Sequence, residues 1–159
     1  MRVKSIEDEN FTNYKEASMT IGTISCNGKC CHDAGIPLTV CLNDRWRRAS
    51  IIDMEDEKIV ERYLSNPMTS AIVFAGLEPF EQFFEMLELI RAFRRKCNDP
   101  IIIYTGYRKD EIEMYIEGLS NFPNIIVKFG RFVPGGKPRY DEVLGVTLVS
   151  ENQYAERIS

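Results

Sequence analysis

Several features that would assign this chain to a common functional class are missing from its 159 residues. No apolar run approaches the ~18 residues of a membrane-spanning helix, and residues 1–8 lack the apolar core of a secretory signal. Lysine and arginine total 20 against 24 aspartate and glutamate residues, a net charge of −4, whereas nucleic-acid binding needs a basic face. We therefore expect a cytoplasmic protein that binds neither membranes nor nucleic acid.

Histidine is scarce, because His32 is the only one, whereas the chain contains five cysteines. Cys97 stands apart, whereas the other four cysteines fall within 16 residues: Cys26, Cys30, Cys31 and Cys41. In a chain without a secretory signal, such a cluster indicates metal binding or redox chemistry before disulfide bonds.

Apolar runs alternate with helical patterns along the chain. Continuous apolar or β-branched runs predict strands at 19–25, 71–75, 101–104 and 125–129. Helical spacing of apolar residues predicts one helix ending before Pro67 and two more over 80–93 and 109–119. A last strand is expected at 143–149, and residues 26–48 are expected to form one long loop.

This alternation predicts a single α/β domain over 1–159, with an open parallel sheet and flanking helices. The chain is too short for a closed eight-stranded barrel, which typically takes ~250 residues, so the alternative is a partial (β/α) barrel. In either fold, ligands bind at the carboxyl ends of the strands. Cys26 follows the first predicted strand, Gly76 and Glu78 follow the second, and Thr105 and Gly106 follow the third. We therefore predict one site at this edge of the sheet.

The cysteine spacing indicates which metal group the site binds. Thiolates bind both iron–sulfur clusters and zinc. Cys26 and Cys30 are separated by three residues, so both sulfurs can face one cluster, whereas the adjacent side chains of Cys30 and Cys31 tend to diverge. We predict Cys41 as the third ligand, with Cys31 as the alternative. Three cysteines leave one iron of a four-iron cluster open, while a structural zinc site needs a fourth ligand such as His32.

Five short segments between about residues 18 and 155 carry a family likeness: Cys26-Asn27-Gly28-Lys29-Cys30, Cys41-Leu42-Asn43, Gly76-Leu77-Glu78-Pro79, Tyr104-Thr105-Gly106-Tyr107 and Ser150-Glu151-Asn152-Gln153. In this order they resemble the motifs of small radical S-adenosylmethionine (SAM) enzymes, specifically the activating proteins of anaerobic ribonucleoside-triphosphate reductase. Two positions depart from the family pattern. Asp33 stands where the third cysteine is usual, and Leu77 replaces the second glycine of Gly-Gly-Glu-Pro.

The resemblance implies a radical-SAM partial barrel and two cofactors. A [4Fe-4S] cluster would be held by Cys26, Cys30 and Cys41. SAM would be bound by residues at the strand ends and in the cluster segment: Gly76, Glu78, Thr105, Gly106 and Asn43. In the family, the reduced cluster cleaves SAM, and the resulting radical takes a hydrogen atom from a glycine of a partner protein.

The same resemblance implies the partners. These are the large subunit of anaerobic ribonucleotide reductase, or another glycyl-radical enzyme, and a reductant such as flavodoxin. The alternatives are a radical-SAM enzyme acting on another substrate and a zinc-binding protein-interaction domain.

Other residues have less specific expectations. Lys128 is expected to extend to solvent rather than to meet the SAM carboxylate. Trp46 and the arginines beside it are candidates for the partner contact, because Trp and Arg are favoured at interfaces, with a solvated basic turn as the alternative. Cys97, at the end of a predicted helix, is expected to be a packed thiol.

Overall fold

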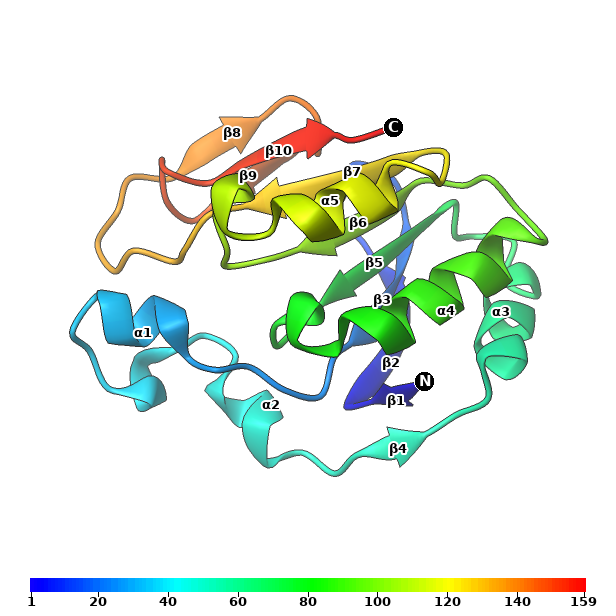
Figure 1. Ribbon diagram of the computed structural model, residues 1–159, viewed down its shortest axis with the longest axis horizontal. Coiled ribbons are helices and arrows are strands. Elements are labelled where there is room, and N and C mark those ends of the chain that lie inside the picture. The colour runs from blue at the N-terminus through cyan, green and yellow to red at the C-terminus, as the bar shows by residue number, and fades with distance from the viewer.

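The computed structural model describes all 159 residues. Six strands form the main sheet: β2 (Ser5–Asn10), β3 (Ser18–Gly22), β5 (Ala71–Ala75), β6 (Ile101–Tyr104), β7 (Ile125–Phe129) and β10 (Tyr154–Arg157). Their spatial order is β10-β7-β6-β5-β3-β2 (Figure 1). The four central strands are parallel, whereas the edge strands β2 and β10 each run antiparallel to their neighbour.

Three helices cover one face of this sheet: α3 (Asp56–Leu64), α4 (Phe83–Arg94) and α5 (Glu113–Leu119). Short 3₁₀ turns, η2 (Pro79–Gln82) and η3 (Lys109–Glu111), precede α4 and α5. The main core lies between the helices and the strand residues that face them, such as Phe74 and Val127. None of the helices is long and apolar enough to cross a membrane.

The opposite face of the sheet is covered by the antiparallel pair β8 (Arg139–Asp141) and β9 (Val146–Leu148). A second, smaller core forms there from residues such as Val73, Ile102 and Leu148. The remaining elements are the strand pair β1 (Arg2–Val3) and β4 (Ile52–Asp53), and the short helices α1 (Lys29–Asp33), η1 (Leu38–Val40) and α2 (Asp44–Arg48). Figure 1 shows α1 on the side toward which the arrows of β5 and β7 point.

The predicted α/β architecture with an open sheet and flanking helices is confirmed. The strands predicted at 71–75, 101–104 and 125–129 coincide with β5, β6 and β7. The sheet does not close into a barrel, and its antiparallel edges make it mixed rather than wholly parallel. The single loop predicted over 26–48 is wrong, because the segment contains three short helical elements. The strand expected at 143–149 is shorter than predicted, because only β9 forms there. It pairs with β8 instead of the main sheet.

Candidate functional site

A cavity of about 820 Å³ lies at the carboxyl ends of β3, β5 and β6 and extends between β2 and β9. Its lining includes all eight residues predicted for the site: Cys26, Cys30, Cys41, Asn43, Gly76, Glu78, Thr105 and Gly106. These residues come from separate segments of the chain, and the parallel strands bring them together because their carboxyl ends share one edge. Cys31, Arg47 and Lys128 line the same cavity.

Cys26 and Cys30 flank the turn that begins α1. Gly28 precedes this helix in the left-handed conformation, with φ of 74°, which favours glycine. The Gly28 amide donates to Cys26 Sγ at 3.3 Å. Cys30 Sγ packs against Gly106, where a Cβ atom would come within 2.6 Å of the sulfur. Gly106 therefore allows a thiol of the cysteine segment to approach the end of β6.

The Cys31 thiol lies beside that of Cys41 and is buried, at 2% exposure. Burial raises the pKa of Cys31, and the neighbouring Cys41 thiol adds to the rise. The structure holds no preformed group of three Cys, His, Asp or Glu side chains arranged for a metal ion, so the ligand set Cys26, Cys30 and Cys41 stays a prediction. The chemistry of the donors does fit a cluster, because four thiols line one cavity and thiolates are the usual ligands of iron–sulfur clusters.

His32 and Cys97 lie outside the cavity. The His32 side chain is 89% exposed and lies 3.5 Å from the carboxylate of Asp33, so it does not join the cysteines as a fourth zinc ligand. Cys97 packs against the main core, and burial raises the pKa of its thiol, which agrees with the expected packed thiol.

Glu78 places a buried carboxylate in the cavity, with 6% exposure. Its Oε1 accepts hydrogen bonds from Thr105 Oγ1 at 2.7 Å and from the Phe80 amide at 3.2 Å. Its Oε2 accepts from the Gly106 amide at 2.9 Å. Burial raises the pKa of Glu78 to about 7, although these hydrogen bonds and the charge of Lys128 act against the rise. A desolvated carboxylate held in one orientation favours a cationic ligand, which would restore its charged form.

Lys128 is buried, so the expectation of a solvent-exposed lysine is wrong. It is 6% exposed, and its Nζ donates to the carbonyls of Gly130 at 3.0 Å and Thr105 at 3.4 Å. Alternation along β7 places Lys128 on the face of Ile126, away from the helices. Burial lowers the pKa of Lys128 to about 8. An ammonium group has three donors, so one remains for an anionic group in the cavity.

Gly76 and Asn43 complete the predicted set. Gly76 has φ of 91°, and a Cβ atom there would lie 3.5 Å from the Cα of Gly22, so the backbones of β3 and β5 stay close where the cavity begins. Leu77, at the position of the family's second glycine, is buried and lines the cavity. Asn43 precedes α2, but its side chain makes no capping hydrogen bond and is free to serve a ligand.

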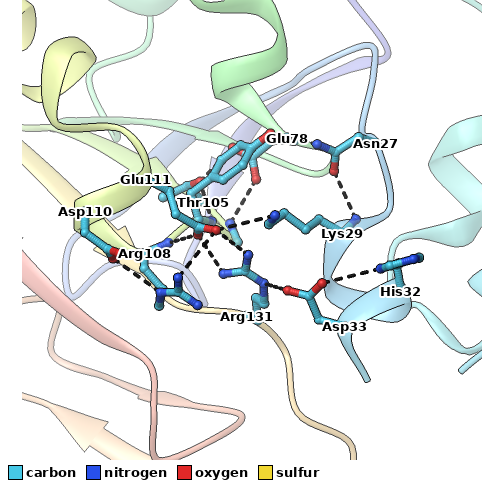
Figure 2. Close-up of polar contacts among 12 residues, drawn as sticks. Asn27, Lys29, His32, Asp33, Glu78, Thr105, Arg108, Asp110, Glu111 and Arg131 are labelled. Atoms are coloured by element: carbon cyan, nitrogen blue, oxygen red, sulfur yellow. Dashed lines mark hydrogen bonds and ion pairs between the residues drawn. The ribbon is translucent and has the colours of Figure 1, made fainter. Parts of the chain in front are cut away.

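The sequence reasoning missed the charged residues that hold α1 against the strand ends. Figure 2 shows Arg131 between Asp33 of α1 and Glu111 of η3. The guanidinium of Arg131 lies 2.6 and 2.7 Å from the carboxylate oxygens of Glu111 and 2.5 Å from that of Asp33. Lys29 Nζ lies 3.5 Å from the same Glu111. Asp33 is therefore an ion-pair partner and does not line the cavity.

A second contact that the sequence reasoning missed anchors the chain just before α1. Asn27 Nδ2 donates to the Tyr107 hydroxyl at 2.7 Å and to the Glu81 carboxylate at 2.9 Å. The Tyr107 hydroxyl in turn donates to Glu81 at 2.6 Å. The segments that follow β3, β5 and β6 are thereby tied together. Asn27 and Tyr107 lie inside two of the motif segments, and this position in the sequence could have indicated that they belong to the site.

Comparison with known families gives a match over most of the chain. The model of a family described as a 4Fe-4S single cluster domain matches residues 24–147, a range that contains all eight predicted site residues. No curated protein and no solved structure matches the chain.

Proposed function

The chain belongs to the 4Fe-4S single cluster domain family, and on that premise we propose that it is a radical-SAM activase of a glycyl-radical enzyme. The proposed cluster ligands are Cys26, Cys30 and Cys41. The proposed partner is the large subunit of anaerobic ribonucleotide reductase, and the proposed fold class is the partial barrel of radical-SAM enzymes. When bound and reduced, a [4Fe-4S] cluster with one open iron supplies the electron that cleaves SAM.

One observation carries this proposal. The eight predicted site residues come from four motif segments, and all of them line a single cavity at the carboxyl ends of parallel strands. Each motif alone is only weakly specific. Strand ends are where an α/β sheet binds its ligands, and the family assignment supplies the cluster for which the cysteines were chosen. A zinc-binding domain has less support, because the only histidine is exposed and outside the cavity.

The polar groups around Thr105 suit the amino-acid end of SAM. The Thr105 hydroxyl donates to Glu78, and the Thr105 carbonyl accepts from Lys128. A carboxylate and an ammonium group therefore lie on either side of one residue, both in the cavity. The methionine part of SAM carries an ammonium and a carboxylate, so Glu78 would bind the first and Lys128 the second. Both residues are buried, and low solvation strengthens such charge pairing.

The mouth of the cavity is suited to closure by a large partner. Leu42 and Trp46 line the cavity, and Leu42 is 65% exposed. Leu38 and Val40, which precede them in the chain, are 45% and 46% exposed. The Arg45 guanidinium lies 5.0 Å from the centre of the Trp46 ring. Exposed apolar residues beside Trp and Arg are typical of protein interfaces. We assign this segment to the partner contact, which would exclude water from the reacting atoms.

The test begins with anaerobic reconstitution of the protein with iron and sulfide. Wild-type protein should become brown and contain about four irons per chain, as expected of one four-iron cluster. Glu78→Gln should keep that iron content but bind SAM at least about tenfold more weakly in equilibrium dialysis, because a charge-assisted hydrogen bond contributes about 1.5–3 kcal/mol. Glu88→Gln, a change at a 62% exposed carboxylate of α4, is the matched control and should bind SAM normally.

The partner is tested separately. Mixing the reconstituted protein with the reductase large subunit, dithionite and SAM should produce the electron spin resonance doublet of a glycyl radical. Methionine release without a doublet would refute the reductase partner and leave SAM cleavage intact. A wild-type protein that takes up zinc but no iron and sulfide would refute the whole proposal.

A further inference from the structure

Arg47 of α2 reaches into the turn between the first two predicted cluster ligands. Its Nη1 donates to the Cys26 carbonyl at 2.9 Å. A Cβ atom on Gly28 would lie 3.4 Å from Arg47 Nη2, so the guanidinium lies against this glycine turn. Lys4 Nζ donates to the Arg47 carbonyl at 3.3 Å and holds the end of α2 in place. The Cys26 carbonyl thus holds the guanidinium, while Lys4 holds the backbone of Arg47.

Two nitrogens of this guanidinium are buried without an acceptor. Arg47 Nε and Nη2 have no hydrogen-bond partner in the protein. The neighbouring arginines differ, because Arg48 pairs with Asp44 at 2.6 Å and Arg45 lies over a Trp ring. Arginine keeps its charge when buried, and an unpaired buried donor costs about 1–3 kcal/mol, more when it is charged. The arrangement therefore favours an anionic acceptor beside the cysteine turn.

We propose that Arg47 donates hydrogen bonds to sulfur at the cluster site and raises the reduction potential there. This inference rests on the proposed function, since it assumes a cluster held by three thiolates. Such a cluster is anionic and gains a further negative charge on reduction, so a fixed cation stabilises the reduced form more than the oxidised form. The guanidinium contacts the cysteine segment rather than Glu78 or Lys128, which assigns it to sulfur and not to SAM.

The experiment compares wild-type protein with Arg47→Gln and Arg47→Lys, each reconstituted anaerobically without SAM. Arg91→Gln is the matched control, because Arg91 lies on α4 outside the cavity and its side chain is 47% exposed. Iron and sulfide content, the far-ultraviolet circular dichroism and the midpoint potential are measured, the last by redox titration with dithionite followed in the visible spectrum. Arg47→Gln should lower the potential by at least about 59 mV, a tenfold change in the one-electron equilibrium. Arg47→Lys should lie between Arg47→Gln and wild type.

The outcomes distinguish failure of the role inferred for Arg47 from failure of the proposed function. An Arg47→Gln cluster with the same potential as wild type and Arg91→Gln would overturn the role of Arg47 while leaving the cluster site established. If Arg47→Gln folds but holds no cluster, retention by Arg47→Lys supports the proposal, and loss in Arg47→Lys as well overturns the charge argument. Failure of wild-type protein to take up iron and sulfide would instead refute the proposed function itself.

Discussion

The raised pKa of Glu78 predicts how the stability of the metal-free protein depends on pH. Burial raises this pKa from 4.5 to about 7. At about 1.4 kcal/mol per pKa unit, the shift corresponds to about 3 kcal/mol. The folded protein binds this proton more tightly than the unfolded chain does, so the contribution of Glu78 to the free energy of unfolding is greatest below pH 4.5. It should fall by about 3 kcal/mol as the pH rises to 7, and then level off.

The assay is urea unfolding of reduced, metal-free protein between pH 4.5 and 7.5, followed by far-ultraviolet circular dichroism. Wild-type protein should lose stability across this range, whereas Glu78→Gln should give a nearly flat curve because glutamine does not titrate. Two other strongly shifted carboxyl groups, Glu85 and Glu111, have their pKa lowered from 4.5 to about 2, so the stability that they contribute is lost mainly below pH 4.5. Lys128, with its pKa lowered to about 8, titrates mostly above it.

The comparison of slopes is more informative than the comparison of absolute stabilities. Glutamine has one acceptor oxygen, so Glu78→Gln also loses hydrogen bonds from Thr105, Phe80 or Gly106, an effect that shifts the whole curve without tilting it. Glu88→Gln should keep the wild-type slope. Parallel curves for wild type and Glu78→Gln would show that Glu78 ionises normally. That result would refute the inference that its carboxylate is desolvated and favours a cationic ligand.

Two further predictions concern the cysteines. Cys41→Ser should lose nearly all reconstituted iron while Cys31→Ser keeps most of it, as measured by iron and sulfide content; the reverse ranking would make Cys31 the third ligand. Gly106→Ala should weaken cluster binding by about 10–100-fold, the cost typical of disturbing a ligand's surroundings, because the new Cβ meets Cys30 Sγ at 2.6 Å. Gly118→Ala adds the same atom inside α5, where its nearest neighbour is 3.8 Å away, and should leave iron content unchanged.

The centre of the sheet was predictable from the sequence, whereas its edges were not. β5, β6 and β7 are buried on both faces, so they appear as short continuous apolar runs. β2 has the sequence Ser-Ile-Glu-Asp-Glu-Asn, which contains little of the apolar or β-branched pattern of a strand. It becomes a strand because it pairs with β3, a contact that no local pattern encodes. The helices α1 and α2 were missed because five residues are too few to show an apolar period.

The site was predictable where strand ends determine it and unpredictable where side-chain packing does. Glu78, Thr105 and Gly106 meet because β5 and β6 are adjacent and parallel. Lys128 was misjudged because a lysine on a strand usually reaches water, and the cover of its face by β9 is a non-local feature. Arg47 lies in a segment whose basic sequence equally suits a solvated turn. Its guanidinium contacts the Cys26 carbonyl and the Gly28 turn, about 20 residues earlier in the chain, and no local pattern encodes this contact.

Asp33 has a structural role at the position where the resemblance to radical-SAM activases expects a third cysteine. The family pattern would place a cysteine at this position, but Asp33 instead pairs with Arg131, which also pairs with Glu111. The Arg131 side chain is 11% exposed and the Asp33 side chain is 39% exposed, so the pair joins a surface carboxylate of α1 to a guanidinium that Glu111 already holds at the strand ends. The structure therefore gives position 33 a role in holding α1 rather than in lining the cavity. Cys41 lines the cavity after η1 and stays the predicted third ligand, with Cys31 as the alternative, so the two cysteine-to-serine variants decide which thiol replaces the missing one.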